Sequence, residues 1–181
     1  MDAISIIASS RRNGNCKQIV DKITEGIIEN GGTNNIYFIE DMNIRGCQGC
    51  RRCKDLDNPT KCILDDDFNR VMEKIEEGRA LIFAAPNYFG EINAQGHLFM
   101  DRFFSMTKTT PNRLKDNPKA VIIHTYGASQ GHYDEYINSR TRRFTSIGFD
   151  VVDVLSVGEN KPSKGDGSKV LLKAKEIGLN L

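Results

Sequence analysis

The sequence predicts an α/β fold in which a parallel sheet has helices on both faces. Short apolar runs at 4–8, 79–85 and 119–125 indicate buried strands, and further strands are expected at 35–39 and 149–157. Segments in which apolar residues recur at helical spacing follow these strands, at about 19–31, 65–77, 94–106, 133–147 and 169–179. Because strands and helices alternate, the strands must run parallel, with the helices as crossover connections.

Composition bounds the class of protein. At 181 residues the chain is long enough for one domain that buries about two-thirds of its unfolded surface. Its net charge is only +1 and its basic residues are scattered, so no nucleic-acid partner is expected. No apolar run reaches the length of a membrane span, and the N-terminal run lacks the basic start of a signal peptide. We therefore expect one cytoplasmic domain over 1–181, with no membrane partner and no disulfides among its five cysteines.

The loop after the first strand combines groups that bind anions. Ser9, Arg11 and Asn15 offer hydroxyl, guanidinium and amide donors at a predicted helix N-terminus, where the dipole and unpaired backbone amides favour a phosphate. Ser9 or Asn13 could instead simply cap the helix. The loop contains neither G-x-x-x-x-G-K-[ST] nor G-x-G-x-x-G, which excludes these nucleotide motifs and leaves a site for one phosphate monoester.

The loop after the third strand carries flat apolar side chains. Pro86 stiffens it, Tyr88 and Phe89 add aromatic area, and Gly90 allows close approach of a ligand. The two rings could also fill the core. Ligands of parallel sheets bind beyond the carboxyl ends of the strands, so this loop and the phosphate loop together indicate a flat ring system with one phosphate, such as FMN.

Four segments resemble those of one family. Residues 8–16, ASSRRNGNC, resemble the G-S-P-R-x-x-G-N-T loop of the flavodoxin-like NAD(P)H-dependent FMN reductases and iron–sulfur flavoproteins, and 86–90, PNYFG, resemble their P-V-Y-F-G loop. Asp101-Arg102 matches their D-R, and 47–67 resembles their C-x-G-C-x-x-C…C-x-x-x-D-D segment. The resemblance covers nearly the whole chain.

The resemblance implies a flavodoxin-like three-layer sandwich with five parallel strands in the order 2-1-3-4-5. It also implies FMN contacts from three loops, made by Ser9, Arg11, Asn13, Gly14, Asn15, Cys16, Pro86, Asn87, Tyr88, Phe89, Gly90, Tyr126, Gly127 and Ala128. Two residues depart from the pattern, since Ser10 replaces proline and Cys16 replaces threonine. A thiol is a weak donor, so Cys16 is expected to lower phosphate affinity slightly.

Four cysteines lie in a loop at about 42–64, and their role has three interpretations. Cys47, Cys50, Cys53 and Cys62 could hold a [4Fe–4S] cluster or a structural zinc ion, or remain free thiols over the flavin. The eight-residue gap before Cys62, with a turn expected at Asp57-Asn58-Pro59, is longer than the gap of the cluster-bearing relatives. This length favours a protein without a cluster.

These observations support an FMN-dependent oxidoreductase. NAD(P)H would deliver hydride to bound FMN, which passes electrons to a quinone, a flavin or a similar acceptor; the cofactor supplies the chemistry, and no acid–base residue is assigned. The alternative is an iron–sulfur flavoprotein that relays single electrons between a ferredoxin-type partner, a [4Fe–4S] cluster and FMN. A third hypothesis is a flavin- or zinc-binding interaction module without turnover. The resemblance implies a homodimer or homotetramer, and the sequence leaves the acceptor and the choice of NADH or NADPH open.

The histidines and the Asp101-Arg102 pair are assigned no catalytic role. His97, His124 and His132 do not have metal-ligand spacing, so packing or surface positions are expected for them. Asp101 and Arg102 are expected to form a local ion pair or a subunit contact.

Overall fold

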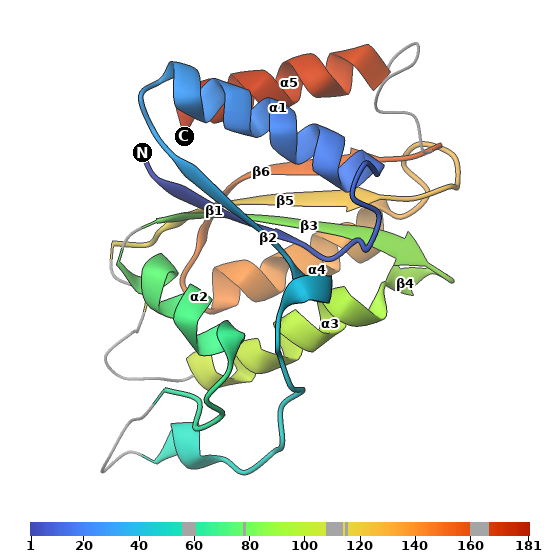
Figure 1. Cartoon of the computed structure of the whole chain (residues 1–181). Coiled ribbons are helices and arrows are strands. Elements are labelled where there is room, and N and C mark those ends of the chain that lie inside the picture. Colours follow the sequence, from blue (N-terminus) through green and yellow to red (C-terminus); the bar gives the residue numbers. More distant parts are fainter. Residues whose placement is uncertain (56–60, 78, 108–113, 115, 160–166) are drawn as a thin grey trace.

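The computed structural model describes residues 1–55, 61–77, 79–107, 114, 116–159 and 167–181. Five parallel strands form its sheet in the order β2-β1-β3-β5-β6, and a sixth, β4, pairs antiparallel with β3 (Figure 1). The strands are β1 (Ala3–Ile7), β2 (Asn34–Phe38), β3 (Ala80–Tyr88), β4 (Glu91–Ile92), β5 (Lys119–Thr125) and β6 (Asp150–Val157). The helices are α1 (Asn15–Glu29), α2 (Asp67–Glu76), α3 (Ala94–Asp101), α4 (Asp134–Ser146) and α5 (Gly167–Asn180), with 3-10 turns η1 (Ile39–Asp41), η2 (Arg52–Lys54) and η3 (Arg102–Met106).

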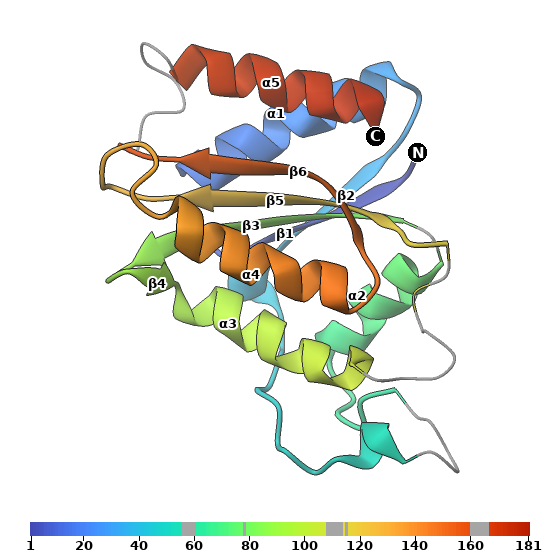
Figure 2. The same cartoon turned by 180° about the vertical axis from the view of Figure 1, so that it is seen from behind.

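Helices cover both faces of the sheet. In Figures 1 and 2, α1 and α5 lie on one face, and α2, α3 and α4 lie on the other. The first pair packs backbone against backbone: a Cβ on Gly178 would lie 2.0 Å from the Ile23 carbonyl oxygen, and a Cβ on Gly26 2.2 Å from that of Lys175. Glycine at these two helix positions is therefore required by space, although glycine lowers helix propensity.

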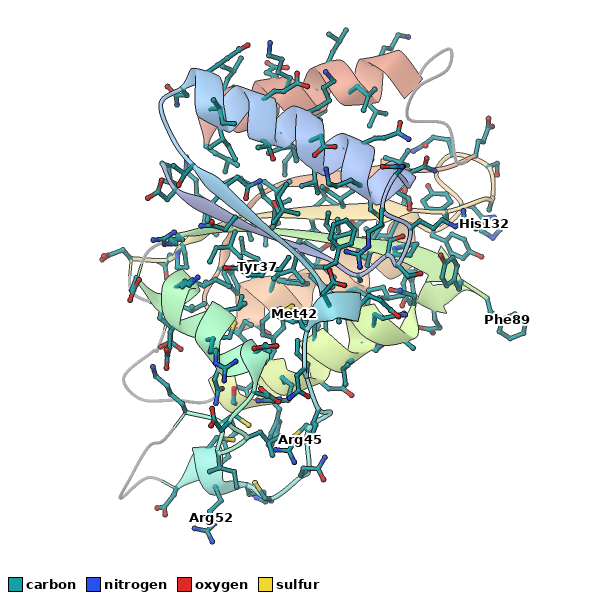
Figure 3. All side chains as sticks on the ribbon, viewed as in Figure 1. Tyr37, Met42, Arg45, Arg52, Phe89 and His132 are labelled. Carbon is teal, nitrogen blue, oxygen red and sulfur yellow. The ribbon has the colours of Figure 1, made fainter. Side chains whose placement is uncertain are left out.

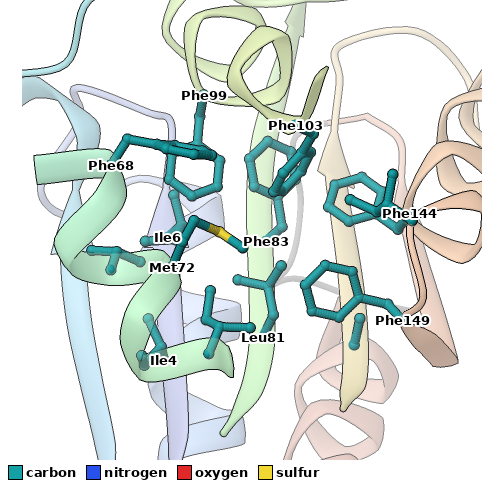
Figure 4. Close-up of a cluster of buried hydrophobic side chains, with 14 of the residues drawn as sticks. Ile4, Ile6, Phe68, Met72, Leu81, Phe83, Phe99, Phe103, Phe144 and Phe149 are labelled. Atoms are coloured by element: carbon teal, nitrogen blue, oxygen red, sulfur yellow. The ribbon is translucent and has the colours of Figure 1, made fainter. Parts of the chain in front are cut away.

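The two faces have separate cores because alternate residues of a strand point to opposite sides. Ile82 and Ala84 of β3 join the cluster under α1 and α5, whereas Leu81 and Phe83 join the cluster under α2, α3 and α4. The second cluster is rich in phenylalanine rings that pack edge to face or tilted, at centroid distances of 5.1 to 6.3 Å (Figure 4). Both faces of the sheet are thereby buried.

The predicted α/β class and the strand order are confirmed, because the five parallel strands counted along the chain have the order 2-1-3-4-5. Some details differ. The third strand continues to Tyr88 and turns back as β4, and the predicted helix 94–106 changes to η3 at Arg102. Ile28 has helical spacing with the core residues of α1 but is 62% exposed. The turn expected at 57–59 lies outside the described residues.

His124 lies in the core, as expected for a packing histidine. It stands on β5 beside Ala85 of β3 and is fully buried. Burial lowers the pKa of its imidazole to about 4, because the charged form cannot be solvated there. The folded protein therefore holds this ring neutral at pH values where the unfolded chain binds a proton.

Acid should destabilise the fold through His124. Its contribution is fully present above the unfolded pKa of about 6.5 and is lost as the pH falls toward the folded value, amounting to about 2 kcal/mol between about pH 7.5 and about pH 5. Urea unfolding at the two pH values measures this loss. The variant His124→Gln should lose correspondingly less, whereas the exposed control His132→Gln should behave as wild type; equal losses in all three proteins would contradict the assignment.

Candidate functional site

The strand order has a switch point at one edge of the sheet. From β1 the chain crosses to β2 on one side, while β3 pairs on the other side, so the loops after β1 and β3 diverge at this point. The loop after β5 ends at the same edge, because all three strands are parallel. The structure thus brings the three predicted loops, 8–14, 86–90 and 126–133, to one edge of the sheet.

The loop after β1 is a tight turn that ends at the N-terminus of α1. The Arg11 backbone N–H donates to Ser9 Oγ at 3.2 Å, and the Gly14 N–H donates to the Arg11 carbonyl at 3.1 Å. The N-cap residue of α1 is Gly14, which makes no side-chain hydrogen bond to the amides of the first turn. Neither Ser9 nor Asn13 is therefore the N-cap residue. The start of α1 therefore has no N-cap side chain over it, which suits an anion site.

The two arginines of this loop have different surroundings. Arg12 forms a bidentate ion pair with Asp41 and lies over the Phe38 ring, with its Cζ 4.3 Å from the centroid. Arg11 is exposed. Of these two guanidinium groups, Arg11 is therefore the candidate for a ligand at the turn.

Cys16 points into the molecule. Its side chain is 1% exposed in the core under α1 and α5, and its Sγ lies 3.4 Å from Thr125 Oγ1. Burial raises the pKa of the thiol to about 11. The thiol therefore ties α1 to β5, and only the backbone of Cys16 faces the anion loop.

The loop after β3 is a hairpin. Tyr88 pairs with Glu91, and the two connecting residues Phe89 and Gly90 have φ of 54° and 85°, as in a type I′ turn. The Phe89 side chain is fully exposed and extends away from the molecule (Figure 3). A bulky residue with positive φ is strained, so this turn holds an aromatic ring in solvent at an energetic cost.

Asn87 and Asn93 contribute side chains beneath this hairpin. Both amide atoms of Asn87 are buried without a partner among the described residues. Asn93 caps α3 by accepting the Gly96 N–H at 3.3 Å, and its Nδ2 donates to the Ala8 carbonyl at 2.7 Å. Asn93 thus joins the start of α3 to the loop after β1.

A tyrosine of α4 fixes the outer side of the hairpin. The Ile92 N–H donates to Tyr136 Oη at 2.9 Å, and that hydroxyl donates to Glu91 Oε2 at 2.6 Å. The hydrogen bond from Tyr136 lowers the pKa of Glu91, with Arg140 contributing from 3.4 Å. The Glu91 carboxylate is therefore ionised over the working range of most enzymes and holds the hairpin against α4.

The loop after β5 is anchored by a buried hydroxyl. Tyr126 is 2% exposed, and its Oη lies 2.9 Å from Ser156 Oγ and accepts the Gly131 N–H at 3.0 Å. Its ring is thus part of the interior, whereas Gly127 is exposed and Ala128 is half-buried. A ligand at the edge would meet the backbone of 127–128 rather than the Tyr126 ring.

The cysteine loop forms a second site on the side of α2 and α3. One small pocket there is lined by Cys47, Cys50, Cys53, Cys62, Arg102 and Phe104. Cys53 is buried, and burial raises the pKa of its thiol. Among the described residues, no three His, Cys, Asp or Glu side chains converge closely enough for one metal ion. The thiols thus share a pocket without yet forming a ligand set.

Two cations anchor this loop. Arg102 is 1% exposed and forms a buried ion pair with Asp66, which also accepts the Arg45 N–H at 3.2 Å. The expected local pair of Asp101 with Arg102 is therefore wrong, because residue 101 is exposed and Arg102 points inward. Lys54 Nζ donates to the Phe104 and Thr107 carbonyls and joins the loop to η3.

Comparison with known proteins places the chain in a family. A family model described as NADPH-dependent FMN reductase matches residues 1–159. The chain belongs to the NADPH-dependent FMN reductase family. It is accordingly an NAD(P)H-dependent flavoprotein oxidoreductase that uses FMN. No helix in the described part of the chain is both long and apolar enough to cross a membrane.

Curated relatives and solved structures agree with this family. An iron–sulfur flavoprotein of Methanosarcina thermophila is 29% identical over 77% of this chain and 70% of its own length. Another, from Methanocaldococcus jannaschii, is 28% identical over 96% of this chain and 84% of its own length. The fold is similar to that of an NAD(P)H:quinone oxidoreductase from Methanothermobacter marburgensis, at a TM-score of 0.75 and 20% identity over 99% of this chain and 95% of that one. A flavodoxin of Megasphaera elsdenii shares the fold at a TM-score of 0.59 and 13% identity, over 97% and 98% of the two chains.

The sequence did not predict the roles of three residues that position the two candidate sites. Asn93 has a detectable signal, since an asparagine directly before a helical segment is a common N-cap. For Tyr136 and Asp66 no sequence signal identifies the partner, because their hydrogen bonds join residues that lie 44 and 36 positions apart in the chain. The assignments of Ser9, Arg11 and the other predicted residues to FMN remain predictions.

Replacing Asn93 should loosen the flavin edge. Asn93→Ala removes the cap of α3 and the hydrogen bond to Ala8, and should lower the free energy of unfolding by about 1 to 2 kcal/mol. FMN affinity should fall as well, because the loops after β1 and β3 lose a direct link. Urea unfolding and FMN titration measure the two effects; the exposed α4 control Asn138→Ala should change neither, and an unchanged Asn93→Ala protein would refute the link.

Relieving the strain at Phe89 should stabilise the fold. Asparagine tolerates positive φ, and Asn-Gly is the preferred type I′ pair, so Phe89→Asn should raise the free energy of unfolding by about 0.5 to 1 kcal/mol. NAD(P)H oxidation should decrease at the same time if the exposed ring contributes to binding. Denaturation and steady-state kinetics on the same preparation test both statements. A variant less stable than wild type would show that Phe89 makes contacts that stabilise the fold.

Proposed function

We propose that FMN binds at the edge formed by the loops after β1, β3 and β5, and that this site passes electrons from NAD(P)H to a quinone, a flavin or a similar acceptor. FMN, when bound, supplies the hydride and electron chemistry. The observation that carries the proposal is the convergence of a helix N-terminus capped by Gly14, an exposed Arg11 and a strained aromatic hairpin at one switch point. The protein's task is to bind, orient and shield.

The phosphate end is assigned to the turn at 9–15. Backbone amides of the first turn of α1 and the Arg11 guanidinium would bind the phosphate of FMN. Asn13, Asn15 and the Ser9 hydroxyl add polar groups around the same turn. The thiol of Cys16 is directed away, so the exchange of threonine for cysteine should matter little at this position.

The ring end is assigned to the hairpin and the loop at 126–128. Backbone groups at 87–90 would meet the isoalloxazine edge, and the orphaned Asn87 amide offers one further donor and acceptor close to it. Half-exposed Tyr88 and fully exposed Phe89 leave aromatic surface beside the ring. A second copy of the chain or a planar acceptor would cover that surface, in line with the expected dimer or tetramer.

The two neighbouring arginines provide a matched test. Arg11→Gln should weaken FMN binding about ten- to a hundredfold, because a hydrogen bond to a charged group is lost, and should leave riboflavin binding unchanged, since riboflavin has no phosphate. Arg12→Gln removes the same charge from a side chain held by Asp41 and Phe38, and should have a much smaller effect. Titration of the metal-free protein with both flavins measures this; equal effects of the two variants would overturn the phosphate assignment.

A second candidate function includes a metal centre. The four cysteines line one pocket, and curated relatives are named iron–sulfur flavoproteins, which supports a [4Fe–4S] cluster that relays single electrons from a protein partner. The hairpin and this pocket lie at opposite ends of α3, whose eight residues span about 12 Å along the axis. The two candidate functions are distinguished by assaying iron and acid-labile sulfide in anaerobically purified protein and recording its visible spectrum. A yellow, iron-free protein favours the two-electron reductase. A brown protein that contains iron and sulfide favours the single-electron relay.

A further inference from the structure

The cysteine pocket contains a guanidinium that is only partly used. Arg102 contacts Asp66 Oδ2 and the Arg45 carbonyl through Nη1 alone. Its Nε and Nη2 are buried, and neither has a partner among the described residues. A buried N–H without an acceptor is costly, so these two groups indicate that an acceptor is missing on this side of Arg102.

The pocket that Arg102 lines identifies the missing acceptor by its chemistry. Its other polar side chains are mostly thiols, which become thiolates when they bind a metal ion. Four thiolates around Zn²⁺, or around an oxidised four-iron cluster, carry a net charge of about −2. Either centre would present sulfur acceptors to a guanidinium in the wall of the pocket.

The charge around the pocket agrees with an anionic centre. Between Ile44 and Lys54 the sequence has four basic residues and no acidic one. Arg45, Arg51 and Arg52 are exposed on this loop, and Figure 3 shows Arg45 and Arg52 on the segment that carries the sulfur atoms. Asp66 pairs with Arg102 rather than with one of these four side chains, so the segment itself is basic.

The ion pair also holds Arg102 in place. Asp66 stands directly before α2, Arg102 directly after α3, and their contact is fully buried. The Arg102 Cζ lies 4.6 Å from the centroid of the Phe68 ring, which supports the guanidinium plane from one side. The orientation of the two open N–H groups is therefore fixed before any metal arrives.

We propose that Arg102 is a positioning residue that donates hydrogen bonds to, and compensates the charge of, a dianionic tetrathiolate centre held by Cys47, Cys50, Cys53 and Cys62. The proposal rests on metal binding by the cysteine pocket, the second candidate function, and is independent of FMN. The thiols release their protons to solvent as the centre forms. Zn²⁺ binding moves no electron, and a four-iron centre of this charge balances without an added oxidant when two ferrous and two ferric ions combine with four sulfides.

The test uses the full chain loaded with FMN and three variants. Asp66→Asn/Arg102→Met removes both buried charges and avoids leaving either one unpaired, and Arg102→Lys keeps the charge but loses the second and third donors. Glu29→Gln/Lys175→Met is the matched control, because it also removes an ion pair, here a surface pair between α1 and α5 on the opposite face of the sheet. Urea unfolding of each metal-free protein shows that it folds.

Two measurements follow under anaerobic conditions. Titration with Zn²⁺ or Co²⁺ should show binding about ten- to a hundredfold weaker in the double variant than in wild type, with Arg102→Lys between them. After reconstitution with equal amounts of ferrous and ferric iron and with sulfide, the reduction potential of the cluster should be lower in both Arg102 variants, since N–H donors to the sulfurs favour the reduced state and neither variant keeps the Nε and Nη2 donors. The Glu29→Gln/Lys175→Met protein should match wild type in both.

The outcomes separate the alternatives. Weaker zinc binding with no cluster formation identifies a zinc centre, and a shifted potential identifies a four-iron centre. Affinities and potentials equal to wild type in folded variants would show that Arg102 is only structural. A wild-type chain that takes up neither metal would also overturn the proposal, while flavin absorbance and NAD(P)H oxidation of the same sample report separately on the reductase function.

Discussion

The pairing of β1 with β3 is the constraint on which the rest of the structure depends. Ile7 is in register with Ala84, and the Ala8 N–H donates to the Ala84 carbonyl at 2.8 Å just beyond the strand. Because β2 has already taken the other side of β1, the chain after β1 and the chain after β3 must leave the sheet edge in different directions. The helix N-terminus of α1 and the β3–β4 hairpin then both lie at the switch point of the strand order, beyond which ligands bind in open parallel sheets.

Side chains from outside the three loops give this edge its shape. Asn93 connects α3 to the first loop, Tyr136 connects α4 to the hairpin, and Ser156 contacts the hydroxyl of Tyr126. Held in this way, the hairpin can keep Phe89 in a strained backbone conformation with its ring in solvent. Strain of this kind persists where the surrounding structure over-determines it, and it is concentrated at functional sites. The shape of this edge is therefore fixed by packing before any ligand binds.

The cysteine pocket, unlike the sheet edge, is positioned mainly by charged side chains. Its loop has little regular structure beyond η2 in the described residues, and it is positioned by the buried pair of Asp66 with Arg102 and by Lys54. A buried ion pair is weak support for stability, because desolvation offsets much of the attraction, but it fixes geometry. Arg102 thus gives the thiol pocket a fixed, positively charged wall. The hairpin lies at one end of α3 and the cysteine pocket at the other.

The sequence by itself determined the α/β class, the strand order through its family resemblance, and the two loops that suit FMN, because apolar periodicity and loop composition are local properties. Arg12 and Arg11 look alike in sequence, and only the folded chain shows that one is held by Asp41 while the other is exposed. The same holds for Cys16, whose thiol meets Thr125 across 109 positions, and for Arg102, whose partner is Asp66 and not its neighbour Asp101. Side-chain direction and long-range partners depend on which elements pack together, and packing is decided only when the whole sheet and its helices assemble.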